Sequence, residues 1–348
     1  MCAHKLKIHP KSNRIEYMDT ARSLCMLWIV AIWHMGRYMD IKLPIYNPYG
    51  TIVTRGVLAT FTFLSGFFLG QITCTTRQNI ATFYIKRLKR FYILYAISCI
   101  SLYGIYIIRN DIAYISSFLQ LLLSLTGLAC FTPPLMPLTV WFLCMMIFLY
   151  TVTPLILIRK ATYYKIFTAF IIYIALIIFY NLGVMDKNLL LYFPVYCLAL
   201  LTPPNIRILK ESFSMNLFLI SFIFSTTCTI LCVNVNSVTM HILTEISICI
   251  LILEISKLIT FPRMQKISSR ISYASMCTYL FHRQYFTIIY KIFNCNGSTA
   301  FAWLIAMPLL IIICYFIQKS YDSGLDFCTI KMKINVNKKF NKDNTSHR

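Results

Sequence analysis

A histidine lies near the far end of the first apolar segment, and an acid and a base lie at its start. The stretch YMDTARSLCMLWIVAIWHMGRY, residues 17–38, contains Asp19, Arg22 and His34. His34 lies about 18 Å beyond Arg22 on a helix that rises roughly 1.5 Å per residue. An imidazole takes up and returns protons near neutral pH, so His34 could serve as a general base toward a hydroxyl group. A histidine that only hydrogen-bonds a neighbouring helix would give the same pattern.

Two arginines share one helix face at the start of the third apolar segment. Arg87 and Arg90 in FYIKRLKRFYILY are three residues apart, so their side chains emerge on the same side of a helix. Two planar guanidinium groups side by side suit a phosphate or pyrophosphate, whose oxygens they bind in pairs. Ordinary basic charge at a cytoplasmic loop, in contact with lipid headgroups, is the alternative interpretation.

Other polar side chains interrupt further apolar segments. Ser65 precedes a glycine in the middle of the second one, FTFLSGFFLG, where small residues allow a helix or a ligand to come close. His282 and Arg283 lie near the middle of a late segment. Glu245 follows His241 by one helical turn, as a second polar site or a structural pair. Each ionisable residue is a functional candidate, because a charge within a membrane span is costly unless it faces a cavity or a partner.

The composition indicates a membrane protein that crosses the bilayer many times. The chain of 348 residues is 58% hydrophobic and 13% charged, whereas a soluble domain carries about a quarter charged residues. Apolar runs of helix length recur along the chain. They lie near residues 22–40, 52–73, 90–108, 138–158, 163–181, 189–202, 214–234, 240–259, 273–293 and 299–318. We therefore expect an all-α integral membrane protein with about ten transmembrane helices.

The positions of the basic residues set the direction of these spans. The net charge of +22 comes from short blocks between apolar runs, so we expect no nucleic-acid partner. If ten spans start from the cytoplasm, the outer loops hold only Arg37, Lys42, Arg109 and Lys187. A crossing at 112–130 would turn every later basic loop outward. We expect this run to lie at the outer interface or to re-enter the bilayer, which leaves both termini in the cytoplasm.

These directions divide the chain into three parts. A basic cytoplasmic N-terminus covers residues 1–21, a membrane domain covers 22–318, and a basic cytoplasmic tail, which we expect to be disordered, covers 319–348. Arg55 lies near the outer end of its span, where a long basic side chain can reach the interface. The 14 cysteines show no CxxC pair and no metal-ligand spacing, so we expect buried free thiols and no metal site.

In their order along the chain, these motifs resemble the membrane acyltransferase family 3. The shared features are the acid, base and histidine of the first segment, the LSGF at 64–67, the RxxR of Arg87 and Arg90, the WFL at 141–143 and the YLFH at 279–282. Together they extend over residues 14–318, nearly the whole chain. The resemblance implies ten spans with both termini inside, in agreement with the distribution of basic residues.

The chain departs from the family pattern in its first segment. Eleven residues separate Arg22 from His34, one more than is usual in the family. The extra residue would turn His34 by about 100° relative to Arg22, unless a bulge in the helix absorbs it. Two smaller departures are Ile93, where a proline is common after RxxR, and the absence of a glutamate shortly after WFL.

The resemblance implies an O-acyltransferase of the bacterial cytoplasmic membrane. It would move an acyl group, acetyl in the simplest case, from acyl-CoA to a hydroxyl of a cell-surface or lipid-linked glycan. Acetyl-CoA or another acyl-CoA is then a co-substrate, no cofactor is permanently bound, and the protein contacts membrane lipid. His34 would act as the general base or as a transient acyl carrier. The implied roles are catalytic for His34, Arg22 and Asp19 and donor-binding for Arg87, Arg90 and Ser65, with His282, Arg283, Trp141 and Glu245 as further candidates.

Two other functions stay open at this point. A transporter or flippase of lipid-linked sugar would be favoured by an inverted repeat, and none stands out in the sequence. A membrane glycan polymerase normally has a large polar outer loop, whereas the one long loop here, 109–137, is mostly apolar. The sequence leaves open the acyl chain, the acceptor glycan and whether the protein forms a homo-oligomer.

Reporter fusions test the predicted direction of the spans. A reporter fused after residue 110 or 135 should lie outside the membrane, and one fused after residue 160 should lie inside, because the basic loops stay cytoplasmic. Alkaline phosphatase activity marks an outer fusion and green fluorescent protein marks an inner one. An outer location for the fusion at 160 would mean that 112–130 crosses the bilayer.

Overall fold

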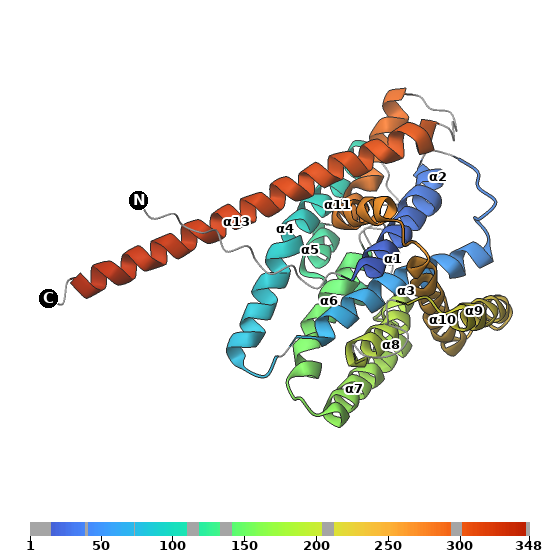
Figure 1. The fold of residues 1–348 in the computed structure, drawn as a ribbon, viewed down its shortest axis with the longest axis horizontal. Coiled ribbons are helices and arrows are strands. Elements are labelled where there is room, and N and C mark those ends of the chain that lie inside the picture. The colour runs from blue at the N-terminus through green and yellow to red at the C-terminus, as the bar shows by residue number, and fades with distance from the viewer. Residues whose placement is uncertain are drawn as a thin grey trace.

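The computed structural model of this chain describes residues 15–38, 41–72, 74–109, 118–132, 141–203, 212–293 and 301–345. Within these ranges every regular element is a helix, as the sequence predicts (Figure 1). The elements are α1 (Glu16–Leu27), η1 (Trp28–His34), α2 (Met35–Tyr38), α3 (Pro48–Gly70), α4 (Arg77–Arg109), α5 (Phe118–Thr126), η2 (Leu128–Phe131), α6 (Trp141–Leu157), α7 (Thr162–Asn181), α8 (Lys187–Leu201), α9 (Met215–Val235), α10 (Val238–Lys257), α11 (Pro262–Phe293), η4 (Ala302–Ala306) and α13 (Met307–Thr345). η1 and η4 are π-helices, and η2 is a 3₁₀-helix.

Each predicted apolar run coincides with one of these helices. Among the described residues, six helices are long and apolar enough to cross a membrane, namely α3, α4, α7, α9, α10 and the segment Ala302–Phe327 that contains η4 and the start of α13. α6 and α8 are apolar but shorter. The α1–η1–α2 segment and α11 contain most of the polar motif residues. The chain is a multi-pass membrane protein, while the number of ten crossings and the cytoplasmic position of the termini stay predictions.

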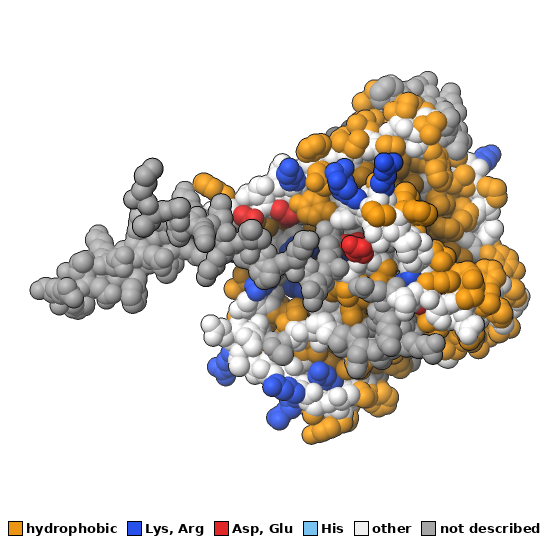
Figure 2. Space-filling model, in the orientation of Figure 1, with side chains coloured by type: hydrophobic (Ala, Val, Ile, Leu, Met, Phe, Trp, Pro, Cys, Tyr) orange, Lys and Arg blue, Asp and Glu red, His pale blue; other side chains and the backbone are white. Residues whose placement is uncertain are grey.

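Exposed apolar side chains cover the outside of the helical bundle. Phe170 of α7, Ile223 of α9 and Phe316 of α13 are each at least half exposed. Figure 2 shows hydrophobic side chains over much of one face, whereas Lys and Arg gather in a few groups. A surface of this kind suits contact with lipid rather than with water.

The contacts between α3 and α8 show that these two helices run in the same direction. Gly66 of α3 lies against Tyr196 of α8, and Gly70 lies against Leu200. Four residues further along α3, the contact lies four residues further along α8, so the two helices are parallel. They correspond to the second and sixth predicted spans, which cross in the same direction. A full crossing at 112–130 would instead have made these helices antiparallel.

The ambiguous run 112–130 forms only a short helix in its described part. α5 has nine residues, or about 14 Å at 1.5 Å per residue, which is less than half of a bilayer core. The hydroxyl of Tyr95 in α4 donates to the carbonyl oxygen of Ser124 at 2.6 Å. The backbone N–H of Asp186, just before α8, donates to the carbonyl oxygen of Cys130 at 3.1 Å. The segment thus packs into the bundle, which suits a re-entrant element.

The tail is helical, and the expectation of disorder was wrong for its described part. α13 continues to Thr345, and its C-terminal part projects beyond the other helices (Figure 1). Extending an existing helix adds one hydrogen bond for each residue fixed, whereas starting a helix is costly. The apolar start of α13 supplies the nucleus, and the lysines that follow are good helix formers.

Gly66 brings α3 into close contact with α8, and this contact is testable. A Cβ atom at this position would lie 2.6 Å from the carbonyl oxygen of Tyr196. Gly66→Ala should therefore destabilise the protein by about 1–3 kcal/mol and lower its Tm in detergent. Gly104→Ala in α4 is the control, because a Cβ there meets no heavy atom within 4 Å. The same Tm for both variants would contradict the close contact.

Candidate active site

Hydrogen bonds fix the start of α1 to α11. The hydroxyl of Ser272 donates to Oδ1 of Asp19 at 2.8 Å, and the hydroxyl of Ser23 donates to the carbonyl oxygen of Ser268 at 2.6 Å. Nη1 of Arg22 lies 3.9 Å from Oδ1 of the same aspartate. Asp19 is therefore held by two groups, and it holds Arg22 one turn further along α1.

Arginines from two helices line one cavity of about 660 Å³. Arg22 comes from α1, and Arg87 and Arg90 come from α4. Asp19 and Ser65, which the sequence also singled out, line the same cavity. The volume is typical of small-molecule sites, which span roughly 300–1,000 Å³. Three guanidinium groups around one cavity favour a ligand that carries phosphate or another anionic group.

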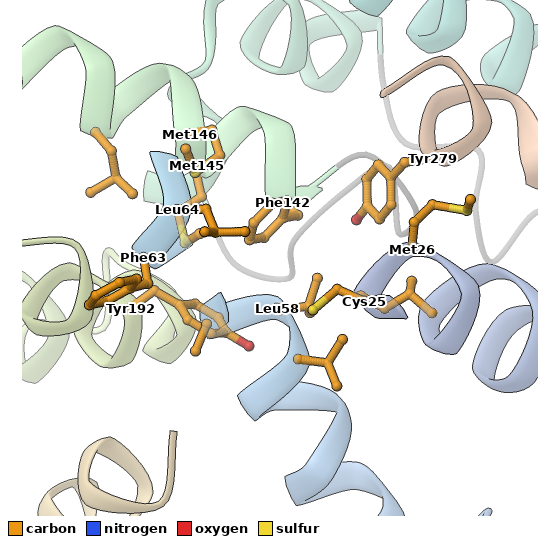
Figure 3. Close-up of a cluster of buried hydrophobic side chains, with 14 of the residues drawn as sticks. Cys25, Met26, Leu58, Phe63, Leu64, Phe142, Met145, Met146, Tyr192 and Tyr279 are labelled. Atoms are coloured by element: carbon orange, nitrogen blue, oxygen red, sulfur yellow. The ribbon is translucent and has the colours of Figure 1, made fainter. Parts of the chain in front are cut away.

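Apolar and aromatic side chains form the deep part of this cavity. The rings of Phe142 in α6 and Tyr279 in α11 lie 5.9 Å apart between centroids (Figure 3). Phe61 of α3 packs on Phe142 at 6.4 Å, and Met146 adds to the lining. This end therefore suits an uncharged chain rather than a phosphate.

His34 pairs with His282. Nδ1 of His34 lies 2.7 Å from Nε2 of His282, and Nδ1 of His282 lies 2.7 Å from the carbonyl oxygen of Tyr279. A carbonyl oxygen only accepts, so Nδ1 of His282 has the hydrogen. In a neutral pair, Nε2 of His282 then accepts from Nδ1–H of His34. This assignment leaves the lone pair of His34 on Nε2, where it can take up a proton.

The histidine pair lies directly behind the deep wall of the cavity. Tyr279 lines the cavity, and its ring lies 5.7 Å from the ring of His282, one helical turn further along α11. His282 is fully buried, whereas His34 is partly exposed. Neither histidine lines the cavity itself. The arrangement runs from arginines through an apolar passage to a histidine pair behind an aromatic wall.

A π-helical turn accommodates the extra residue between Arg22 and His34. Residues Trp28–His34 form η1, between the α-helical segments α1 and α2. A π turn holds more residues than an α turn because its hydrogen bonds run from i to i+5. The turn of about 100° that a straight α-helix would give is thereby absorbed. The spacing departure predicted either a rotation or a bulge, and the bulge is what the structure shows.

The remaining candidates lie away from the cavity. The guanidinium of Arg283 stacks over the ring of Tyr106 at 4.8 Å. Trp141 packs on Phe142 and Tyr192, with ring centroids 6.0 and 6.2 Å apart, and so helps to build the aromatic wall. These contacts give Trp141 a packing role.

A second polar cluster lies near the start of α10. Glu245 is 1% exposed, and neither carboxylate oxygen has a hydrogen-bond partner among the described residues. Nη1 of Arg55 lies 3.3 Å from Nδ1 of His241, whose Nε2 lies 2.9 Å from Oδ1 of Asn236. Arg55, which is half-buried, thus has a polar partner on α10, and its position at the membrane interface stays a prediction.

Sequence reasoning missed three residues at the cavity mouth. Tyr273 of α11 and Gln318 and Asp322 of α13 line the cavity together with the arginines. The two α13 residues were assigned to the end of the last span and to the tail. A signal was present, since Gln318 and Asp322 are four residues apart on one helix face.

One comparison with known proteins identifies the family of the chain. A family model described as an acyltransferase domain matches residues 15–319. The match covers both histidines, the three arginines and Ser65, while Asp322 lies beyond it. None of the curated proteins and none of the solved structures matches the chain.

Proposed function

The chain belongs to this acyltransferase family, and from that premise we propose that it is a membrane O-acyltransferase. It transfers an acyl group, acetyl in the simplest case, from acyl-CoA to a hydroxyl of a cell-surface or lipid-linked glycan at the bacterial cytoplasmic membrane. The observation that supports this function best is the single cavity with Arg22, Arg87 and Arg90 at its polar part and the histidine pair behind its deep wall. Nothing in the described residues favours a transporter or a polymerase.

The arginines bind the phosphate groups of the donor. Arg87 and Arg90 share one face of α4, and Arg22 faces the same cavity from α1. Planar guanidinium groups bind phosphate oxygens in pairs, which a lysine cannot do. The uncharged pantetheine arm then extends past Ser65 into the part of the cavity lined by Phe142 and Tyr279. This orientation directs the thioester toward the histidine pair.

His34 supplies the base that a sugar hydroxyl requires. Nε2 of His34 takes the hydroxyl proton as the oxygen attacks the thioester carbonyl carbon. The carbon–sulfur bond then breaks, and the proton passes to the departing thiolate to give free CoA. His282 positions the ring by accepting from Nδ1–H of His34 at 2.7 Å. In a variant of this scheme, Nε2 of His34 attacks first and carries the acyl group to the hydroxyl.

The aromatic wall must open for this step. Neither histidine lines the cavity, whereas Tyr279 does, with its ring 5.7 Å from that of His282 and 5.9 Å from that of Phe142. The thioester therefore meets Nε2 of His34 only when one of these rings moves aside.

Substitution of the arginine pair tests donor binding. Arg87→Ala or Arg90→Ala should raise the KM for acetyl-CoA by a factor of about ten or more, since hydrogen bonds to charged groups contribute roughly 1.5–3 kcal/mol. Arg→Lys should restore little, because the planar fork is lost. Lys86→Ala is the control, because Lys86 is exposed on the same helix and does not line the cavity. An unchanged KM for acetyl-CoA in both alanine variants would mean that Arg87 and Arg90 are ordinary basic residues at the membrane surface.

Substitution of His34 tests the base. His34→Ala and His34→Gln should both abolish transfer of labelled acetyl to glycan, while the proteins still insert and bind acetyl-CoA. Glutamine keeps a hydrogen-bonding side chain but cannot take the proton. His241→Gln, in the separate polar cluster, should retain transfer. Near wild-type turnover in His34→Gln would mean that His34 only packs, and His282 would become the first alternative base.

A further inference from the structure

The mouth of the cavity contains polar groups that the transfer step does not use. The hydroxyl of Tyr273 donates to Oδ2 of Asp322 at 2.5 Å, and Nε2 of Gln318 donates to Oδ1 of the same carboxylate at 2.9 Å. All three residues line the cavity. Two side chains, from α11 and α13, thus hold the carboxylate of Asp322 in a fixed orientation at the cavity wall.

The carboxylate of Asp322 would repel a phosphate bound at the arginines of the same cavity, so its presence in the lining has to be explained. Asp19, the other acid of the lining, is accounted for by its hydrogen bond from Ser272 and its proximity to Arg22. Asp322 has no arginine within salt-bridge distance among the described residues. A carboxylate has about four acceptor positions, so Asp322 can still accept hydrogen bonds from a ligand. The group that it suits is one that donates hydrogen bonds and carries no negative charge.

The order of groups along the donor says which part of it reaches Asp322. This step rests on the proposed function. An acyl-CoA is linear, with the thioester at one end, then the pantetheine arm, the diphosphate and an adenosine whose ribose carries a 3′-phosphate. With the thioester at Tyr279 and the diphosphate at the arginines, the adenosine lies on the side away from His34. Tyr273 lies about 9 Å back from Tyr279 along α11, at 1.5 Å per residue.

The position of α13 agrees with this order. The hydroxyl of Tyr321 donates to the carbonyl oxygen of Lys89, the residue before Arg90. This segment of α13 therefore lies beside the arginine pair. Asp322 follows Tyr321 directly and faces the cavity. The acceptor groups of α13 are thus next to the place where the diphosphate would bind.

We propose that Asp322, Gln318 and Tyr273 form an adenosine subsite for the acyl donor. The carboxylate of Asp322 accepts from the exocyclic amino group of adenine or from the 2′-hydroxyl, the one free hydroxyl of the ribose. Tyr273 offers an aromatic ring, 36% exposed, on which a base can stack. Gln318 orients the carboxylate through its own hydrogen bond.

Two donors that differ in the adenosine test the subsite. Acetyl-CoA and acetyl-phosphopantetheine share the thioester, the arm and its phosphate, but the second lacks the adenosine 3′,5′-bisphosphate part. Asp322→Asn should raise the KM for acetyl-CoA by about tenfold, the loss expected for a hydrogen bond to a charged group. Its kcat and its KM for acetyl-phosphopantetheine should stay unchanged. Asp326→Asn, one turn further on α13, is the control, because Asp326 is exposed and does not line the cavity.

The other outcomes overturn the subsite. An equal rise of KM for both donors would give Asp322 a general structural role, and an unchanged or lowered KM for acetyl-CoA would mean that its carboxylate only repels phosphate. Failure of the proposed function would look different, since the wild-type protein would then use neither donor. In that case direct binding of adenosine 3′,5′-bisphosphate decides. Weaker binding to Asp322→Asn than to wild type supports the subsite, and equal binding overturns it.

Discussion

A polar side chain inside a bilayer has to face a partner or a cavity, and this constraint organises the whole site. α11 supplies many of the partners. Its Ser272 binds Asp19 of α1, its Leu280 carbonyl accepts from Ser98 of α4 at 2.7 Å, and its His282 binds His34 of η1. These contacts hold α1 and α4 around α11. The arginines of α1 and α4 can therefore line one cavity, and the two histidines can meet behind Tyr279, a residue of its lining.

The same packing separates two tasks that conflict chemically. In the proposed function, binding a phosphorylated donor needs fixed positive charge, which Arg22, Arg87 and Arg90 provide in the cavity lining. Proton transfer at a thioester needs a dry place, because water competes with the acceptor hydroxyl. Phe142 and Tyr279 divide these two environments, and Tyr279 belongs to both, since its ring lines the cavity and its carbonyl oxygen orients His282. In the proposed function, Tyr279 therefore contacts both the donor site and the histidine pair that contains the base.

The sequence predicted those site residues that are polar or charged and lie within or at the start of an apolar segment, where their free-energy cost is evident. Asp19, Arg22, Ser65, Arg87 and Arg90 interrupt or begin apolar segments, and the structure gathers all five around one cavity. Contacts between residues far apart in the chain could not be predicted from the sequence. Periodicity shows which face of a helix is polar, but not which other helix that face contacts. The pairing of His34 with His282 across 248 positions is one example. Arg55 is another, since its reach to His241 depends on how α3 and α10 pack. Asp322 escaped notice because its helix looks like an ordinary polar tail from composition alone.

The π turn at Trp28–His34 has a consequence for how such proteins diverge. In a straight helix, an added residue rotates everything that follows it, so an insertion within a span would have to be matched by changes in every helix that it touches. Here the extra residue is accommodated in one π-helical turn, and the helix on either side keeps its register. A lineage could therefore gain or lose a codon in this turn in a single event, without compensating substitutions elsewhere. Searches that demand a fixed gap between the arginine and the histidine would pass over such a chain, although it contains both residues.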